Sequence, residues 1–233
     1  DYIDLYWLHA WDRVTPAEEV LQTMGDLVRS GKIRYFGFSD VPAWYASKAA
    51  TLASAHGLPG PIALQLEYSL IERNIEHEHL PAARECGLGL CSWSPLAGGF
   101  LAGKYERPAK GSDTGGVSGS GRYEFWKGFK PLVESHWQLL QCLRAVAAEL
   151  EQSPAQVALA WVAARLGISA PIVGARTLEQ WRGHLAALSL RLTDAQLQAL
   201  DECSRLPSAH PYNLFGDEVN RLIFGGATVR GGQ

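Results

Sequence analysis

The chain has 233 residues, of which 47% are hydrophobic, 10% aromatic and 19% charged. This composition is typical of a globular protein and excludes disordered and collagenous classes. No window holds 18 uninterrupted apolar residues, so the sequence predicts no membrane-spanning helix. The formal charge of −3 comes without a basic stripe, and we therefore expect neither nucleic acid nor a membrane as a partner.

Four cysteines are spread along the chain, at Cys86, Cys91, Cys142 and Cys203, with no C-x-x-C pair. In a chain of this length that spacing predicts buried thiols in a reducing compartment rather than a disulfide framework, and it offers no metal-ligand set. The first nine residues carry two aspartates and no basic segment, so no signal peptide is predicted there. The expected location is the cytoplasm.

Short runs rich in branched and aromatic residues alternate along the chain with helical patterns. The clearest helical repeat runs from Val20 to Val28, and Gly31 ends that helix. The expected strands are Tyr2–His9, Ile33–Ser39, Ile62–Glu67, Leu88–Trp93 and Ala170–Gly174.

Four Ser/Thr-x-x-Glu/Gln motifs predict helix starts with reciprocal capping bonds. They begin at Thr15, Ser153, Thr177 and Thr193. After the fourth strand, helices are expected over about residues 132–151 and 154–166. The Gly- and Ser-rich stretch 107–122 is expected to form a surface loop, and the last two dozen residues show the low periodicity of a loose tail.

The first four strands begin roughly 25–30 residues apart, which is the spacing of successive βαβ units with parallel strands. A doubly wound dinucleotide-binding fold would carry G-x-G-x-x-G after its first strand, whereas residues 8–12 (LHAWD) contain no glycine. Instead, polar or distinctive residues end every expected strand, which is where a (β/α)8 barrel places its chemistry. We therefore predict an α/β fold of the (β/α)8 TIM-barrel type, with about five of its eight βα units in this chain. The strand-end residues are His9, Ser39, Asp40, Gln65, Glu67, Trp93, Ser94 and Gly174–Arg176.

Five segments resemble, in order, the C-terminal two thirds of the aldo-keto reductase family. They are DYIDLYWLHAWD, GKIRYFGFSD, LQLEYSLIER, SWSPLAGGFLAGKY and PIVGARTLEQ. The resemblance assigns them to strands 4–8 of that family's barrel. It covers about residues 1–212 and leaves a C-terminal tail over 213–233. The fourth segment is most similar to the branch that contains bacterial general-stress reductases and the potassium-channel β subunits.

The strand ends suggest how a nicotinamide and a carbonyl substrate would be held. His9 can donate a hydrogen bond to a carbonyl oxygen, and the resemblance makes it the histidine of the catalytic tetrad. Ser39 and Gln65 can hydrogen-bond a carboxamide such as that of nicotinamide. Asp40 stands where the family often has asparagine, so it can accept from the carboxamide amine but cannot donate. The resemblance implies that Trp93 stacks on the nicotinamide ring, although core packing would also explain this side chain.

Two further groups of residues would hold the rest of the dinucleotide. The turn after the fourth strand can present backbone N–H groups to a pyrophosphate, and Lys104 adds a charge. Arg176 before a helix start suits a ribose 2′-phosphate, which favours NADP over NAD. The resemblance implies adenosine contacts for Gln180 and for His184, which replaces the family's usual asparagine. The expected cofactor-binding residues are Ser39, Asp40, Gln65, Trp93, Ser94, Pro95, Leu96, Ala97, Gly98, Lys104, Gly174, Arg176, Gln180 and His184.

The resemblance implies an NADP(H)-dependent oxidoreductase that reduces aldehydes or ketones to alcohols by hydride transfer, without a metal. In the family a tyrosine donates the proton, tuned by an aspartate and a lysine, and all three precede the fourth strand. Tyr2 and Tyr6 belong to that strand and cannot replace the tyrosine. We therefore expect the N-terminal third of the barrel to be absent from this chain, which would leave strand edges open to self-association.

Two other interpretations stay open from the sequence. The chain can be a non-catalytic, nucleotide-binding or partner-binding remnant of an aldo-keto reductase, or a different TIM-barrel enzyme with the same general architecture. The carbonyl substrate depends on the loops between strands and helices. Trp11, Trp44, Tyr45 and residues 123–129 either line the mouth of such a barrel or serve only for packing.

Overall fold

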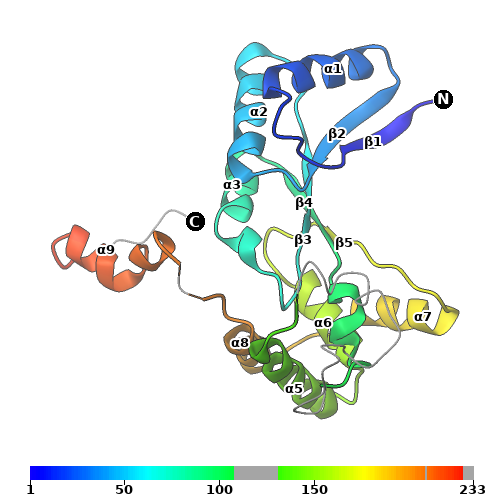
Figure 1. Cartoon of the computed structure of the whole chain (residues 1–233), viewed down its shortest axis with the longest axis vertical. Helices are drawn as coiled ribbons and strands as arrows, with labels where there is room; N and C mark the ends of the chain where they lie inside the picture. The colour runs from blue at the N-terminus through cyan, green and yellow to red at the C-terminus, as the bar shows by residue number, and fades with distance from the viewer. Residues whose placement is uncertain (108–130, 208, 228–233) are drawn as a thin grey trace.

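The computed structural model describes residues 1–107, 131–207 and 209–227 (Figure 1). In this part of the chain five strands alternate with helices. The strands are β1 (Ile3–Leu8), β2 (Ile33–Ser39), β3 (Ala63–Glu67), β4 (Gly89–Trp93) and β5 (Ala170–Pro171). The helices are α1 (Ala17–Arg29), α2 (Ala43–His56), α3 (His79–Glu85), α5 (Glu134–Glu149), α6 (Pro154–Ala163), α7 (Leu178–Ala187), α8 (Asp194–Cys203) and α9 (Asp217–Ile223), with 3-10 turns η1 (Asn74–Glu76), η2 (Ala97–Ala102) and η3 (Tyr212–Leu214).

The five strands form one parallel sheet in the order β1-β2-β3-β4-β5. Spatial order therefore follows chain order, whereas a doubly wound sheet reverses direction at a switch point. The predicted α/β fold with parallel strands is confirmed, and the sequential order is consistent with a (β/α)8 barrel. The last strand is shorter than predicted, because after Pro171 only the N–H of Ile172 still bonds to β4, at Ser92, before the chain turns toward α7.

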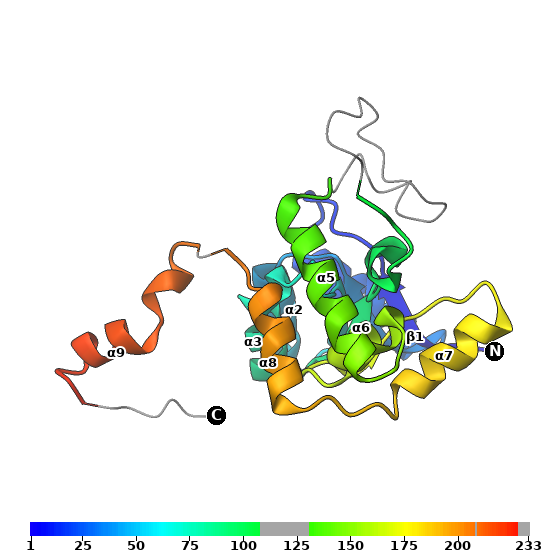
Figure 2. The same ribbon diagram turned by 90° about the horizontal axis from the view of Figure 1, so that it is seen from below.

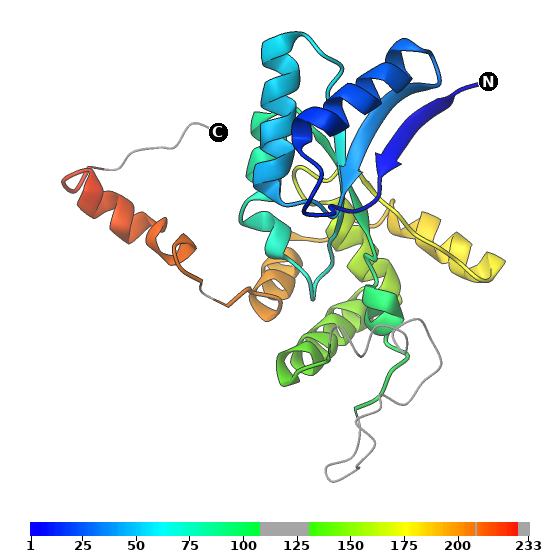
Figure 3. The same ribbon diagram turned by 45° about the horizontal axis from the view of Figure 1, so that its top comes forward.

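Helices α1, α2 and α3 cover one face of the sheet (Figures 1 and 3). Side chains alternate between the two faces of a strand. Leu64 and Leu66 of β3 and Leu90 of β4 are buried in the core that these helices share. Gln65 and Cys91 point to the other face and are half-buried. The polar side chain of Gln65 therefore lies on the face that these helices do not cover.

A close approach of three strands depends on Gly37. It is the register partner of Trp7 in β1 and of Ala63 in β3. A Cβ at residue 37 would lie 2.4 Å from the Trp7 ring and 2.7 Å from the carbonyl oxygen of Ala63. Only glycine leaves room for the indole to cross β2.

A second group of helices extends the core near the carboxyl ends of the strands. Leu140 and Leu143 of α5, with Val157 and Trp161 of α6, are fully buried. Helix α5 packs against both α6 and α8, and α5 and α8 lie side by side in Figure 2. These helices complete one hydrophobic cluster with α1–α3.

The helix starts test the predicted capping boxes. The side chains of Ser153 and Thr193 each accept from the backbone N–H three residues later, and their own backbone N–H donates to the side-chain oxygen of the glutamine there, so these two predictions are confirmed. The prediction at Thr15 is wrong, because α1 begins at Ala17 and the Thr15 hydroxyl donates to the carboxylate of Asp12 instead. Asp12 also accepts from the backbone N–H groups of Val14 and Thr15, so its carboxylate holds Thr15 in the turn before the helix.

The sequence predicts a surface loop after β4 and a C-terminal tail. Residues 108–122 of the expected surface loop and the aromatic segment 123–129 lie outside the described residues. In the expected tail, α9 forms despite the low periodicity, and it projects away from the sheet (Figures 1 and 2). Its apolar Leu222 and Ile223 are exposed. Across residues 1–107, 131–207 and 209–227, no helix combines the length and hydropathy needed to cross a membrane.

Candidate active site

Backbone hydrogen bonds hold the carboxyl ends of β2, β3 and β4 together. The N–H of Asp40 donates to the carbonyl of Gln65, and the N–H of Tyr68 donates to the carbonyl of Trp93, each at 3.2 Å. Ser39 lies opposite Gln65 in the sheet register. The structure therefore brings Ser39, Asp40, Gln65 and Trp93 to one edge of the sheet, and these are residues that the sequence assigns to the nicotinamide.

Asp40 fixes the orientation of the Trp93 ring. The indole Nε1–H donates to Asp40 Oδ1 at 3.1 Å. Asp40 has a φ of 48°, in the left-handed region that Asp and Asn tolerate better than most residues. The sequence assigns both residues to the cofactor separately and misses this contact, because the two lie 53 positions apart and no local pattern links them.

The hydroxyl of Ser39 is a buried polar group without a partner. Ser39 is fully buried, and its Oγ has no hydrogen-bond partner among the described residues. Leaving such a hydroxyl unsatisfied costs about 1–3 kcal/mol. Ser92 Oγ is in the same state, but Ser92 lies on the helix-covered face of β4. Ser39 and the half-buried amide of Gln65 together fit a carboxamide, which needs both a donor and an acceptor.

The turn after β4 has an unusual backbone. Ser94 and Ala97 have φ values of 54° and 49°, which L-residues adopt at a cost and mostly at functional positions. Pro95 is buried, and Leu96 packs against the core. The N–H of Ala97 donates to the Ser94 carbonyl at 2.8 Å, and that of Gly98 donates to Ser94 Oγ at 3.2 Å. These two amides are satisfied within the turn, so they would reach a pyrophosphate only after those bonds open.

Lys104 lies across this turn. A Cβ at Gly99 would be 3.0 Å from Lys104 Cε, and the φ of +95° at this position also requires glycine. The Lys104 ammonium is 5.6 Å from the centroid of the Tyr105 ring. The structure thus places a positive charge over the turn that the sequence assigns to the pyrophosphate.

Residues 174–177 lead from β5 into α7. Thr177 caps α7 by accepting from the N–H of Gln180 at 3.2 Å. Gln180 Oε1 accepts from the N–H of Arg176 at 2.8 Å, rather than from Thr177 as a capping box requires. Gly174 and Arg176 are exposed, and the Arg176 guanidinium has no ion-pair partner within the described residues. This leaves an uncompensated cation beside the start of a helix, as an anion site needs.

His184, one turn beyond Gln180, carries a second orphaned polar atom. Its Nδ1 is buried without a hydrogen-bond partner among the described residues. Burial lowers the pKa of the His184 imidazole, so the ring is neutral near pH 7. A neutral imidazole can offer a ligand either a donor or an acceptor.

His9 and a group of aromatic side chains lie at the carboxyl end of β1. His9 follows the strand directly and is exposed. Trp11, two residues further, packs edge-on against Trp44, with ring centroids 5.7 Å apart, and Trp44 is 57% exposed. A cavity of about 190 Å³ is lined by Leu8, Trp11 and Tyr45 among others. Asp12, Thr15, Glu19 and Thr23 line the same cavity, so polar groups adjoin these aromatic side chains.

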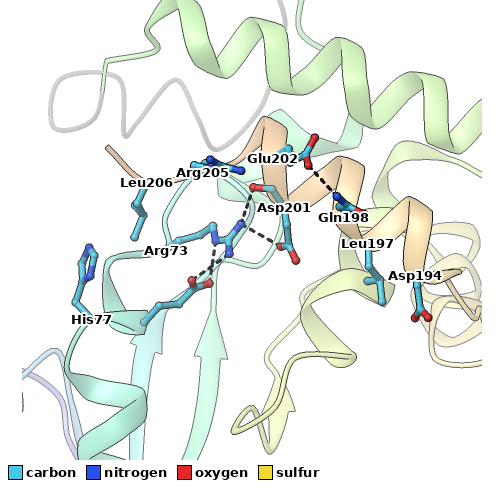
Figure 4. A pocket seen from close by; sticks show the side chains of 10 residues that line it. Arg73, His77, Asp194, Leu197, Gln198, Asp201, Glu202, Arg205 and Leu206 are labelled. Atoms are coloured by element: carbon cyan, nitrogen blue, oxygen red, sulfur yellow. Dashed lines mark hydrogen bonds and ion pairs between the residues drawn. The ribbon is translucent and has the colours of Figure 1, made fainter. Parts of the chain in front are cut away.

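A larger cavity, of about 720 Å³, lies between η1 and α8 (Figure 4). Arg73, which is 7% exposed, donates there to Glu76 at 2.8 and 3.0 Å, to Asp201 at 3.1 Å and to Ser204 Oγ at 2.6 Å. Arg165 also pairs with Asp201, at 2.9 Å. Since these charges are already paired, the network anchors α8 to the segment after β3 rather than offering a free charge to a ligand. The sequence misses it, because Arg73 and Asp201 are 128 positions apart.

Tyr68 belongs to the same network. Its hydroxyl donates to Glu76 at 2.6 Å, and its ring stacks on Trp161 with centroids 5.4 Å apart. Burial, followed by the bond to Glu76, raises the pKa of Tyr68 far above its usual value. Tyr68 therefore keeps its proton and serves packing rather than proton transfer.

The chain is similar to known oxidoreductases. A family model described as "Aldo/keto reductase family" matches residues 1–205. The chain is 39% identical over 202 residues to the oxidoreductase YrpG of Bacillus subtilis, which covers 87% of this chain and 58% of that protein. It is 30% identical over 222 residues to the Saccharomyces cerevisiae protein named "Probable aryl-alcohol dehydrogenase AAD4", covering 94% of this chain and 65% of that protein.

The chain is also similar to a protein that is named as an ion-channel subunit. It is 35% identical over 195 residues to the rice protein named "Probable voltage-gated potassium channel subunit beta", covering 82% of this chain and 57% of that protein. The chain thus spans between 57% and 65% of the length of these three relatives. The matches agree with the resemblance of the five strand-end segments and with the branch that they indicate. The chain belongs to the aldo/keto reductase family.

Proposed function

We propose that the protein is an NADP(H)-dependent oxidoreductase that interconverts carbonyl compounds and alcohols. The proposal depends on one observation: Ser39, Gln65 and Trp93 lie together at the ends of adjacent strands. They provide an orphaned hydroxyl, a half-buried amide and an indole held by Asp40. These groups match the carboxamide and the ring face of nicotinamide. The family and the names of two relatives support oxidoreductase activity.

Each residue of this group would have a separate task. Ser39 and Gln65 would hold the carboxamide and so determine which ring face meets the substrate. Trp93, whose ring is oriented by Asp40, would cover the opposite face and exclude water. His9 would donate a hydrogen bond to the carbonyl oxygen of the substrate. Bound NADPH would supply the hydride to the carbonyl carbon.

The preference for NADP over NAD is proposed from Arg176 and α7. The exposed guanidinium lies beside the N-terminus of a ten-residue helix, where partial positive charge favours a phosphate. A guanidinium matches the geometry of a phosphate group, whereas a ribose hydroxyl would leave it unpaired. His184 and Gln180 on the same helix are proposed to contact the adenosine.

We also propose that β1–β5 are strands 4–8 of a (β/α)8 barrel. The sequential parallel order supports this, as does the share of the relatives' length that the chain spans. Further βα units would then supply the tyrosine, aspartate and lysine that the family resemblance implies. Carbonyl reduction is proposed for the whole protein on this basis.

An aromatic carbonyl compound is the proposed substrate class. Trp11 follows His9 by two residues in the chain, and it packs against Trp44 to form an apolar, aromatic pair. Aromatic rings stack well against such side chains. The name of the yeast relative, an aryl-alcohol dehydrogenase, supports the same class.

The cytoplasm is the proposed location, and a small molecule rather than a nucleic acid is the proposed partner. All four cysteines are free thiols, which supports a reducing compartment. The net charge of −3 supports the absence of a nucleic-acid surface.

A second candidate function is cofactor binding without catalysis, in a protein that acts through a partner. The similarity to a potassium-channel β subunit favours this alternative. Both functions need the nicotinamide site, and only the first needs turnover. Consumption of NADPH with a panel of aromatic and aliphatic aldehydes separates them.

The cofactor assignment is tested by titrating the chain with NADPH and NADH while following tryptophan fluorescence. Replacing Arg176 by Ala is expected to weaken NADPH binding by about tenfold or more, because a charge-assisted bond contributes about 1.5–3 kcal/mol. NADH binding is expected to change less than about twofold. Arg182→Ala, an exposed arginine on the same helix, is the matched control and should affect neither cofactor. Equal losses for both cofactors in Arg176→Ala would overturn the 2′-phosphate assignment.

A further inference from the structure

Helices α5 and α8 lie side by side (Figure 2), and each of them carries a cysteine. The Sγ of Cys142, on α5, donates to the carbonyl of Ala199, on α8, at 3.6 Å. Cys203 follows Ala199 by four positions, so both lie on the same face of α8. Helical side chains lean toward the N-terminus, which carries the Cys203 thiol back over the turn that contains Ala199. The Cys203 thiol therefore lies near Cys142, close enough to affect its ionisation.

We propose that Cys142 and Cys203 are a redox-modification site, which forms a reversible disulfide between α5 and α8 when the protein meets a hydroperoxide. Both thiols are free in the structure. Neither belongs to the nicotinamide site, so the proposal stands apart from the proposed function. Cys86 and Cys91 lie on other elements, at the end of α3 and in β4.

The two cysteines differ in a way that gives each a role. Cys203 is exposed at the last position of α8, so a hydroperoxide can reach it. Cys142 is half-buried, and burial, followed by the nearby Cys203 thiol, raises the pKa of its thiol. Because it is less exposed than Cys203, Cys142 is less accessible to a hydroperoxide. Cys203 is therefore the thiol that reacts first, and Cys142 is the one that resolves the product.

The chemistry balances in two steps. The Cys203 sulfur attacks the terminal oxygen of the hydroperoxide and breaks its O–O bond, which leaves a sulfenic acid on Cys203 and releases an alcohol, or water from hydrogen peroxide. The Cys142 sulfur then attacks the Cys203 sulfur, the S–O bond breaks, and the Cys142 proton leaves with the hydroxide as water. The two thiols lose two electrons and two protons in total, and the hydroperoxide is reduced.

The position of Cys203 gives the link a structural consequence. Asp201 and Ser204, on either side of it, both bind Arg73, which lies after β3. A disulfide would tie that end of α8 to α5 and close a loop that contains α6, β5 and α7. Closing such a loop reduces the conformational entropy of the unfolded chain and stabilises the fold.

The test oxidises the reduced, full-length chain with hydrogen peroxide and counts free thiols by mass after alkylation. Two of the four thiols are expected to disappear, and digestion should yield one linked peptide pair that joins Cys142 to Cys203. The midpoint of thermal unfolding should rise on the order of 5 °C. Dithiothreitol should reverse both changes.

Single variants check the roles of the two thiols. Cys142→Ser should leave a sulfenic acid on Cys203 that dimedone traps, whereas Cys203→Ser should leave Cys142 unoxidised. Cys86→Ser is the matched control and should still form the link. If a variant does not fold, the presence or absence of the Cys142–Cys203 peptide pair in the oxidised, unaltered chain decides whether the proposal holds. Four free thiols after oxidation, a different pairing, or a disulfide between two chains would each overturn the proposal.

Discussion

Asp40 has two roles at the carboxyl end of β2. Its backbone takes the left-handed conformation that turns the chain toward α2, and its carboxylate accepts from the indole of Trp93. The family often has asparagine at this position. Both side chains tolerate a positive φ and both carry an acceptor oxygen, so the replacement keeps the contact to Trp93. The residue is therefore proposed to act on the cofactor through the orientation of Trp93.

Asp40→Gly is expected to weaken NADPH binding about threefold to tenfold. Glycine accepts a φ of 48° without strain, so this change removes the acceptor for the indole and leaves the backbone conformation in place. Asp40→Asn keeps an acceptor and should bind NADPH within about twofold of the unaltered chain. Fluorescence titration measures both. Equal affinity for Asp40→Gly and the unaltered chain would contradict a positioning role for Asp40.

At the scale of elements, the sheet is held together by close contact as well as by its hydrogen-bonded ladder. The Trp7 ring lies over β2 at Gly37, so one side chain links β1 to β2. This contact lies on the face that α1–α3 do not cover. It therefore stabilises β1, whose residues are otherwise exposed or half-buried.

Gly37→Ala is expected to lower the free energy of unfolding by about 3 kcal/mol. The added methyl would meet the Trp7 ring and a backbone carbonyl that cannot move without breaking the sheet register. Gly183→Ala, in α7 with open space around its Cβ position, is the control and should raise stability by about 0.5–1 kcal/mol. Chemical denaturation measures both variants. A stable Gly37→Ala chain would show that Trp7 does not pack across β2.

Helix α8 depends on a polar anchor. Arg73→Met is expected to destabilise the fold by about 2–4 kcal/mol, because it leaves Glu76 without its arginine and Asp201 with Arg165 alone. The lower part of that range is expected, since both carboxylates keep some exposure to water. Arg29→Met removes an exposed pair with Asp26 and should cost less than about 1 kcal/mol. Similar losses for the two variants would contradict the anchoring role of Arg73.

At the scale of the whole molecule, β1 is an edge. Its only neighbour among the described strands is β2, and Ile3 and Tyr6 are 50% and 40% exposed. An unpaired strand with exposed apolar side chains offers a template for pairing with another chain. We propose that the same edge is where a further βα unit would join the sheet in a closed barrel.

The 233-residue polypeptide by itself is expected to self-associate as its concentration rises, because β1 can pair with a second chain. Ile3→Lys puts a charge on that edge and should shift the distribution toward monomer in sedimentation velocity. Val14→Lys, at an 85% exposed loop position, is the matched control and should leave the distribution unchanged. A monomeric, cooperatively unfolding chain would contradict this prediction.

The sequence by itself determined the parallel α/β fold, the family and most strand bounds. Strand β2 spans the predicted Ile33–Ser39, and β3 and β4 begin within one residue of their predicted starts. These features depend on short-range patterns, such as apolar runs, caps and strand-end residues, which a linear reading of the chain contains. The cofactor residues stay a prediction that the placement of Ser39, Gln65 and Trp93 supports.

Only the tertiary structure decided the contacts between distant elements. The bond of Trp93 to Asp40, the anchoring of Arg73 by Asp201 and the meeting of Cys142 with Cys203 each join different elements. The same holds for the wrong prediction at Thr15, where the acceptor Asp12 stands outside the capping motif. Such contacts depend on how helices and strands pack, and the periodicity of a single element carries no information about which distant side chain it will meet.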